Sequence, residues 1–233
     1  MNSIPTHIAV IFELTTVITL LLFYWTVRHS SLESVRKKSN IVLIGGVIWL
    51  SIQAVLALNQ VYSFDTNVVP PKLILYGLLP NLLMIVYLFA TTKGRAFMDS
   101  LPLNKLAYIS IVRIPVEFVL LALFMTQSIP QIMTFEGRNF DIISGITAPI
   151  IAYWGLTKGK LSRSIILAWH FLCLALLLNI VLIGILSTPF PFQKFAFDQP
   201  NIAILYFPFN WLPSFIVPIV LFSHLVSIRQ LSK

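Results

Sequence analysis

Long runs of hydrophobic residues, separated by short polar segments, cover almost the whole chain. A bilayer core about 30 Å thick needs roughly 20 apolar residues in each helical span. Seven runs approach or exceed that length, so the pattern predicts seven transmembrane helices. These runs cover approximately residues 7–28, 40–62, 72–92, 105–126, 140–157, 164–187 and 203–228. The fifth run is the shortest, and it contains Gly145 and Pro149.

Basic residues between the runs predict how the helices are oriented, because lysine and arginine favour the cytosolic side of a membrane. The loops after the first, third and fifth runs, together with the C-terminal tail, contain 12 basic residues. The opposite loops contain Lys72, Arg138 and Lys194, and Arg113 lies inside the fourth run. The 12 residues on the first side are Arg28, Arg36, Lys37, Lys38, Lys93, Arg95, Lys105, Lys158, Lys160, Arg163, Arg229 and Lys233.

This alternation predicts an all-α membrane protein, a bundle of seven transmembrane helices with its N-terminus outside and its C-terminus in the cytosol. Residues 1–233 form one membrane domain in this interpretation, and the expected location is the plasma membrane (the inner membrane of a bacterium). The sequence does not indicate an oligomeric state.

Composition supports the lipid bilayer as the main partner. Of the 233 residues, 58% are hydrophobic and 10% are charged, whereas a soluble domain has about 25% charged residues. The net charge of +8 does not indicate a nucleic-acid-binding protein, because the basic residues form short clusters between apolar runs and not one soluble face. We therefore expect no nucleic-acid partner.

Ionisable residues inside a span are costly, and by default they indicate a functional site. Arg113 and Glu117 are four residues apart in the fourth run, so they share a helix face on either side of Pro115. They form either an internal ion pair that joins helices or a charged part of a ligand or ion site. Glu13, in the first run, has a similar depth to Glu117, and two carboxylates beside one arginine could share a proton.

Uncharged polar residues also occur inside the runs. Asn81 follows a proline in the third run, His170 lies in the sixth, and Asn210 and His224 lie in the seventh. Side chains of this kind either join helices by hydrogen bonds or line a polar site. Three prolines in the seventh run predict a kinked helix, with a hinge as the alternative.

Two outer segments have a distinct composition. Residues 187–201 read STPFPFQKFAFDQPN and are rich in phenylalanine and proline, which favours a loop folded onto the membrane interface over a lid on a cavity. Residues 135–141 read FEGRNFD. We interpret them as a solvated helix start, with Asn139 or Asp141 as the N-cap, in preference to a substrate-entry motif.

The sequence excludes several functions. The last run has no lysine before Lys233, which disfavours a retinal pigment. No HExxH, GxSxG or Walker motif is present. No cofactor is predicted, although a haem held between His170 and His224 is a minor alternative.

The first hypothesis is a protein that binds and translocates a small solute or ion through a polar site at the membrane midplane, with proton coupling through a carboxylate. A non-transporting receptor or a protein that binds a lipid or another apolar ligand is the alternative, and an intramembrane enzyme ranks last. No catalytic or metal-binding residues are predicted. The candidate ligand-binding residues are Glu13, Asn81, Arg113, Glu117, His170 and Asn210.

Overall fold

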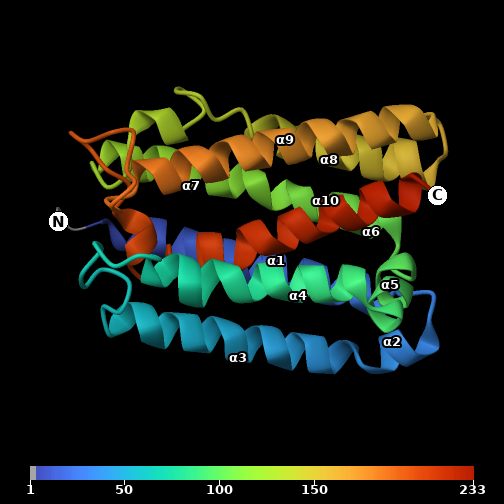
Figure 1. Ribbon diagram of the computed structural model, residues 1–233. Helices are drawn as coiled ribbons and strands as arrows, with labels where there is room; N and C mark the ends of the chain where they lie inside the picture. Colours follow the sequence, from blue (N-terminus) through green and yellow to red (C-terminus); the bar gives the residue numbers. More distant parts are fainter. Residues whose placement is uncertain (1–3) are drawn as a thin grey trace.

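The computed structural model describes residues 4–233, and within that range every regular element is helical. The long helices lie side by side along one axis, with the start of the first helix at one end of the bundle and the C-terminus at the other (Figure 1). The elements in order are α1 (Thr6–Arg28), α2 (Glu33–Lys37), α3 (Ser39–Leu58), the π-helix η1 (Leu73–Leu78), α4 (Leu79–Ala90), α5 (Thr92–Asp99), α6 (Leu103–Ile109), η2 (Ser110–Val112), α7 (Arg113–Met125), η3 (Gln131–Met133), α8 (Ile142–Ile150), the π-helix η4 (Ile151–Thr157), α9 (Arg163–Ser187), η5 (Ala203–Leu205), the π-helix η6 (Leu212–Ile216) and α10 (Val217–Leu231).

Five continuous helices in the described range are long and apolar enough to cross a membrane: Thr6–Arg28, Ser39–Leu58, Leu103–Met125, Arg163–Ser187 and Leu212–Leu231. A sixth results if Ile74–Ala90 and Thr92–Asp99 count as one span, but the chain bends by 94° between them. Ile142–Thr157 is apolar and shorter. The predicted all-helical fold is therefore confirmed, whereas the count of seven spans and their orientation stay predictions.

Large apolar side chains cover the outside of the bundle. On α1 and α3, Leu14, Ile41 and Leu58 are all more than half exposed, and α9 exposes Leu182 by 60%. A soluble monomer rarely leaves such extended apolar surfaces in water. The surface chemistry therefore agrees with the hydropathy of the helices.

The helix in the second apolar run ends earlier than the run predicts, and the helix in the seventh run begins later. The second helix stops at Leu58, and Gln60 has a left-handed φ of 59° that no α-helix accommodates. The last predicted span was to begin at residue 203, yet the continuous helix begins at Leu212. Pro208 lies in the turn before it, and Pro213 occupies its first turn, where a proline needs no backbone donor.

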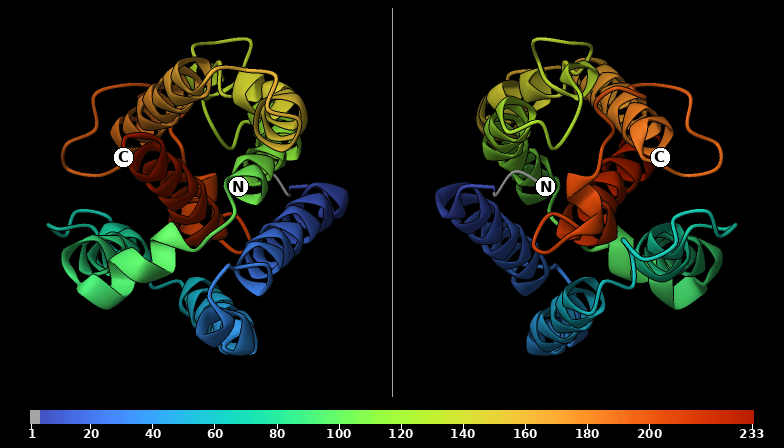
Figure 2. Two further views of the ribbon diagram at one scale, coloured as in Figure 1. Left: turned by 90° about the vertical axis from the view of Figure 1, so that its right-hand side faces the viewer. Right: turned by 90° about the vertical axis from the view of Figure 1, so that its left-hand side faces the viewer.

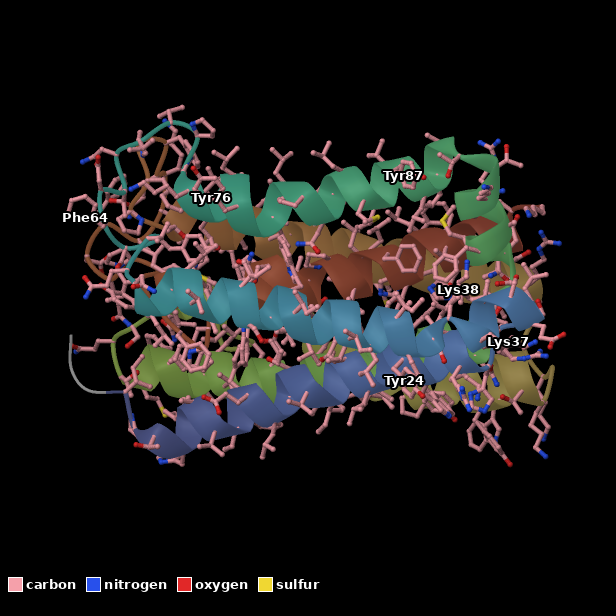
Figure 3. The ribbon with its side chains drawn as sticks, turned by 90° about the horizontal axis from the view of Figure 1, so that it is seen from below. Tyr24, Lys37, Lys38, Phe64, Tyr76 and Tyr87 are labelled. Carbon is pink, nitrogen blue, oxygen red and sulfur yellow. The ribbon has the colours of Figure 1, made fainter. Side chains whose placement is uncertain are left out.

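One end of the bundle carries most of the basic residues. There the backbone N–H of Ser31 donates to the carbonyl of Ser100 at 2.9 Å, which joins the loop after α1 to the loop after α5. Asp99 pairs with Arg229 and Lys233 from the C-terminal part of the chain. Lys37 and Lys38 lie at this end and Phe64 at the other (Figure 3).

Candidate functional site

A buried ion pair joins α7 to the start of α8. Arg113 and Asp141 are 3% and 5% exposed, and Nη1 of the arginine donates to Oδ1 of the aspartate at 2.7 Å. The same nitrogen donates to the carbonyl oxygen of Cys173 in α9 at 3.2 Å. One guanidinium therefore connects three helices. Asp141 is the N-cap residue of α8, as one alternative for this segment predicted, but its carboxylate makes no capping hydrogen bond.

Gly145 allows α8 to approach closely enough for this pair to form. A Cβ atom at Gly145 would lie 2.8 Å from Cγ1 of Ile114 and 3.1 Å from its backbone nitrogen. It would also lie 3.3 Å from the carbonyl oxygen of Ser110. Because α8 meets the backbone of α7 one turn after Asp141, the aspartate can reach the guanidinium of Arg113.

Glu117, one turn after Arg113, has a different partner. Its Oε1 accepts a hydrogen bond from Nδ2 of Asn139, which also donates to the carbonyl oxygen of Met133 at 3.1 Å. Oδ1 of Asn139 accepts from the backbone N–H of Asp141 at 3.1 Å. Glu117 is 1% exposed, and its second oxygen, Oε2, has no hydrogen-bond partner among the described residues. The ion pair considered for Arg113 and Glu117 is therefore not formed.

Two buried histidines continue the cluster. Nη2 of Arg113 lies 3.0 Å from Nε2 of His224, and Nδ1 of His224 lies 3.0 Å from Nδ1 of His170. A guanidinium only donates, so Nε2 of His224 must accept. Neutral His224 then carries its hydrogen on Nδ1 and donates to His170, which carries its own on Nε2. The ring centroids are 5.2 Å apart, which leaves no room for a haem between the histidines.

We call Arg113, Glu117, Asn139, Asp141, His170 and His224 the polar cluster. Among the described residues, no three His, Cys, Asp or Glu side chains are arranged to hold a metal ion. The polar cluster can therefore interact with a ligand through hydrogen bonds and charge.

An apolar cavity of about 80 Å³ adjoins the polar cluster. Arg113, Glu117 and Asp141 are the charged residues in its wall, and aliphatic side chains form most of the rest. The other lining residues are Leu73, Ile74, Leu78, Val116, Leu120, Met133, Leu177, Ile180, Val181, Gly184, Ile185, Phe190, Asn201, Ile204, Leu212, Pro213, Ile216, Val217 and Val220.

The loop of residues 188–201 contributes two residues to the cavity wall, and hydrogen bonds attach it to the bundle. Phe190 and Asn201 line the cavity, and Nδ2 of Asn201 donates to the carbonyl oxygen of Gly184 at 3.1 Å. Nε2 of Gln199 donates to the carbonyl oxygen of Ile129 at 2.6 Å. These bonds hold the loop against α9 and the segment after α7. The residues between Phe190 and Asn201 do not line the cavity, so a lid over it stays a prediction.

The side of the cavity between η1 and α9 is less enclosed. Leu78 from η1 and Ile180, Val181 and Ile185 from α9 line the cavity, and each is only partly buried. Viewed along the bundle, α4 and α9 lie on either side of α10 (Figure 2). The cavity wall therefore reaches the apolar outer surface of the bundle between η1 and α9.

Asn81 and Asn210, two predicted site residues, do not line this cavity. Nδ2 of Asn81 donates to the carbonyl oxygens of Gly77 and Ser214, at 2.7 and 2.9 Å. Nδ2 of Asn210 donates to the carbonyl oxygen of Gln53 at 3.0 Å. Both amides join helices, which was the alternative role considered for such residues.

Prolines explain why carbonyl groups are available for these side chains. Pro80 and Pro218 lack the N–H groups that would pair with the carbonyls of Tyr76 and Ser214 in a regular α-helix. Nε2 of Gln53 donates to the carbonyl oxygen of Tyr76 at 3.1 Å. Nε1 of Trp49 donates to that of Ser214 at 2.8 Å, beside the bond from Asn81. Side chains of α3 thus attach it to η1 and η6.

Glu13 is partly buried in α1 and does not line the cavity. Asn139 and Asp141, in contrast, belong to the polar cluster, although their segment was expected to be a solvated helix start. Asn139 is fully buried. The signal in the sequence was the deep position of Arg113, which requires a carboxylate acceptor. Asp141, at the start of the next span, is a nearby candidate for that acceptor.

The fold and this site define a class of protein. It is an all-helical bundle of apolar, span-length helices, with a charged cluster beside a cavity. Residues 70–232 match the family model described as Domain of unknown function (DUF8737), which covers more than half of the chain, so the protein belongs to that family. No curated protein and no solved structure matches the chain. All residues of the polar cluster and the cavity wall fall inside the matched region, whereas α1 and α3 precede it.

Proposed function

We propose that the protein is a seven-span membrane protein that binds an amphiphilic molecule from the bilayer, with the molecule's polar end at Arg113 and Glu117, the first part of its hydrocarbon chain in the cavity, and the rest of the chain extending between η1 and α9 toward the lipid. The observation that carries this proposal is an aliphatic cavity wall that includes the buried carboxylate of Glu117. One oxygen of this carboxylate, Oε2, has no hydrogen-bond partner among the described residues. Ligand pockets are typically apolar with a few polar groups that fix orientation. This favours the apolar-ligand alternative over a polar path through the bundle.

The partly buried residues between η1 and α9 support access from the lipid. Phe190 and Asn201 are buried where they line the cavity, whereas Leu78 and Ile180 are only partly buried, so a hydrocarbon chain meets less obstruction between η1 and α9. An apolar chain that passes between these helices moves from lipid into an aliphatic cavity and exposes no apolar surface to water.

Photolabelling tests this function. The probe is a 16-carbon fatty alcohol with a diazirine in mid-chain, incorporated into nanodiscs that contain the full-length protein. We expect adducts, displaced by excess unlabelled alcohol, in peptides that contain Ile180–Ile185 and Leu212–Val217. Gly184→Leu should reduce the displaceable labelling at least fivefold, because the added side chain occupies cavity space beside Met133 and Asn201.

Two variants of α9 serve as controls. A Cβ atom at Gly184 would make only ordinary contacts, 3.4 Å from Cε of Met133, so Gly184→Ala should keep most of the labelling. Leu182 is 60% exposed on the outside of α9, so Leu182→Phe should leave displaceable labelling unchanged. Equal displaceable labelling of the Gly184→Leu protein would contradict the proposal.

The orientation is part of the proposal, with the N-terminus outside and the C-terminus in the cytosol of a plasma membrane. The positive-inside rule supports it, since 12 basic residues belong to loops on one side and three to loops on the other. Cys173 is the only cysteine and is buried. In a Cys173→Ala background, an impermeant maleimide added to whole cells should label Phe197→Cys and not Lys37→Cys. The reverse result would invert the topology.

Translocation of a small solute or ion is a second candidate, and the buried carboxylates of Glu117 and Asp141 favour it. If a proton is the coupling ion, the interior of proteoliposomes that contain a pH-sensitive dye should acidify when an inward gradient of the transported solute is imposed. Glu117→Gln should remove that flux without loss of folded protein. Unchanged flux in this variant would argue against translocation through this site.

A further inference from the structure

Many cationic side chains at the basic end of the bundle are already engaged by the protein. Those that pair with a carboxylate or donate to a backbone carbonyl oxygen are Arg36, Lys37, Arg95, Arg163, Arg229 and Lys233. Glu33 and Asp99, the acidic residues that the structure describes at this end, both take part in these pairs. Within residues 4–233, the remaining cations at this end form no ion pair.

Three of these remaining cations lie on one side of the basic end. Arg28 is at the end of α1, Lys105 is in the first turn of α6, and Lys158 directly follows η4. Arg28 and Lys158 are exposed, and Lys105 is partly buried. Their charges are therefore accessible to an anion from outside the bundle.

A cation–π contact joins Lys105 to α1. Its Nζ lies 3.8 Å from the ring centroid of Trp25, and the ring centroid of Tyr108, one turn further along α6, lies 6.3 Å from that of the same indole. Arg28 comes three residues after Trp25, so these two residues share a face of α1. Arg28 and Lys105 therefore lie on the same side of the junction between α1 and α6.

A hydrogen bond joins the start of α6 to the end of η4. Nδ2 of Asn104 donates to Oγ1 of Thr157 at 3.2 Å, and Lys105 and Lys158 each follow one of these residues in the sequence. The helix α6 packs against both α1 and η4, which lie on either side of it when the bundle is viewed along its axis (Figure 2). We call the following residues the basic rim: Trp25, Arg28, Lys105 and Lys158.

Exposed aromatic side chains lie at the same level as these cations. Trp25, Tyr153 and Trp154 are all exposed, and Nζ of Lys158 lies 5.5 Å from the ring centroid of Tyr153. Tryptophan and tyrosine are enriched at the interface between membrane and water, at the level of the lipid head groups. The anions closest to the basic rim in a bilayer are therefore the phosphates of lipids.

We propose that the basic rim binds the head group of an anionic phospholipid. The charges are complementary, because three cations without a protein counter-ion surround the recessed start of α6 and attract a phosphodiester. A zwitterionic lipid carries its own ammonium group, which the same cations repel. The basic rim shares no residue with the cavity wall, so this site does not depend on the proposed function.

Two lipids that differ in head-group charge test this site. Dioleoylphosphatidylglycerol and dioleoylphosphatidylcholine have the same acyl chains, but only the first has a net negative charge. Each is titrated into detergent micelles of the full-length protein, and native mass spectrometry counts the bound lipids. We expect the first phosphatidylglycerol to bind about tenfold more tightly than the first phosphatidylcholine, because each lysine or arginine near an anionic lipid strengthens binding severalfold.

Lys105→Gln/Lys158→Gln removes two cations from the basic rim and should reduce this preference about fivefold. The matched control is Lys38→Gln/Lys93→Gln. Both of these lysines are exposed at the basic end, but they belong to the segments of α2 and α5, so the net charge falls equally and the preference should stay. If loss of the contact with Trp25 prevents folding, the exposed Arg28 provides a further variant, and Arg28→Gln should lower the preference about threefold.

The outcomes separate a lipid site from a diffuse positive charge and from a site for a soluble anion. Equal affinity for the two lipids would overturn the proposal. An equal loss of preference in the two double variants would also overturn it, because the attraction would then come from the net charge of the whole end. Displacement of phosphatidylglycerol by a large excess of glycerol 1-phosphate would assign the basic rim to a soluble phosphate instead. None of these results bears on the cavity, whose adducts form with a neutral alcohol.

Discussion

Nη1 of Arg113 lies 2.7 Å from Oδ1 of Asp141, although 28 residues separate them in the sequence. The two side chains are almost fully buried, and they attach the shortest apolar helical segment, α8 with η4, to α7. A charge in such a position is stable only while its partner is present. The pair therefore determines how α8 is held in the bundle.

Removing one member of this pair should destabilise the protein strongly. We expect Asp141→Ala to cost about 3–5 kcal/mol of unfolding free energy, because it leaves the guanidinium of Arg113 buried without its counter-ion. Unfolding in mixed detergent micelles measures the loss. The double variant Arg113→Leu/Asp141→Ala should be more stable than Asp141→Ala alone, and a double variant that is less stable would count against a charge effect.

Asn139 should contribute to stability through three hydrogen bonds. Asn139→Ala removes its bonds to Glu117 and to the carbonyl of Met133, and it leaves the backbone N–H of Asp141 without an acceptor. We expect a cost of about 1–3 kcal/mol in the same unfolding assay. Asn179, which is exposed and donates to the carbonyl of Arg138, is the control. Asn179→Ala should change stability by less than about 0.5 kcal/mol, and equal costs would refute the assignment.

Gly145 should tolerate no larger side chain. We expect Gly145→Ala to cost about 1–3 kcal/mol, because its Cβ atom would push against Ile114 and move α8 away from α7. Gly45 in α3 has no atom within 4 Å of the corresponding Cβ position, so Gly45→Ala should be neutral or slightly stabilising. Thermal unfolding followed by size-exclusion chromatography compares the two. Similar melting temperatures would show that α8 can relax.

Trp49 and Asn81 should act together, since both donate to the carbonyl oxygen of Ser214. Hydrogen bonds between membrane helices contribute on average about 0.6 kcal/mol each. Trp49→Phe and Asn81→Leu should each have a small effect, because the other donor still satisfies the carbonyl. The double variant should lose more than the sum of the single variants in a double-mutant cycle. Strict additivity would show that the two bonds are independent.

The C-terminal end of α10 should detach from α5 in acid. Burial opposes the charge on Asp99, but hydrogen bonds and attraction from Arg229 and Lys233 outweigh it, so the pKa of Asp99 is lower than its usual value of 3.8. The contribution of Asp99 to stability is therefore complete above pH 3.8, and it is lost as the pH falls through the lower pKa of the folded state. Hydrogen exchange in the last turn of α10 should increase in that range, and Asp99→Asn should show the increase already at pH 7.

The apolar runs were sufficient to predict the helices, because a 20-residue run without charges has few other stable structures in lipid. They could not define the ends of the helices. The second and seventh runs continue through residues such as Gln60 and Phe207, which are in turns, since apolar loop residues also pack at the end of the bundle. The short helix α5 was not predicted either, because its polar residues resembled a loop.

The candidate site was predicted in part. Arg113, Glu117 and His170 do belong to one cluster, and their depth in apolar runs was the signal. Which side chain pairs with which could not be predicted, because helical spacing describes neighbours on one helix only. The partner of Arg113 comes from α8, and its position depends on the close packing at Gly145. Ligand binding by these residues stays a prediction.

Hydrogen bonds of Gln199 and Asn201 hold the loop of residues 188–201 in place, and this attachment bears on how the cavity exchanges its contents. If the cavity exchanges its contents only with the surrounding lipid, occupancy follows the mole fraction of the amphiphile in the membrane and not its concentration in the aqueous phase. Doubling the amount of lipid at constant total amphiphile should then halve its mole fraction in the membrane and lower occupancy as a twofold dilution would. In that case exchange rates should also depend on the fluidity of the bilayer, with the membrane as the reservoir of the ligand.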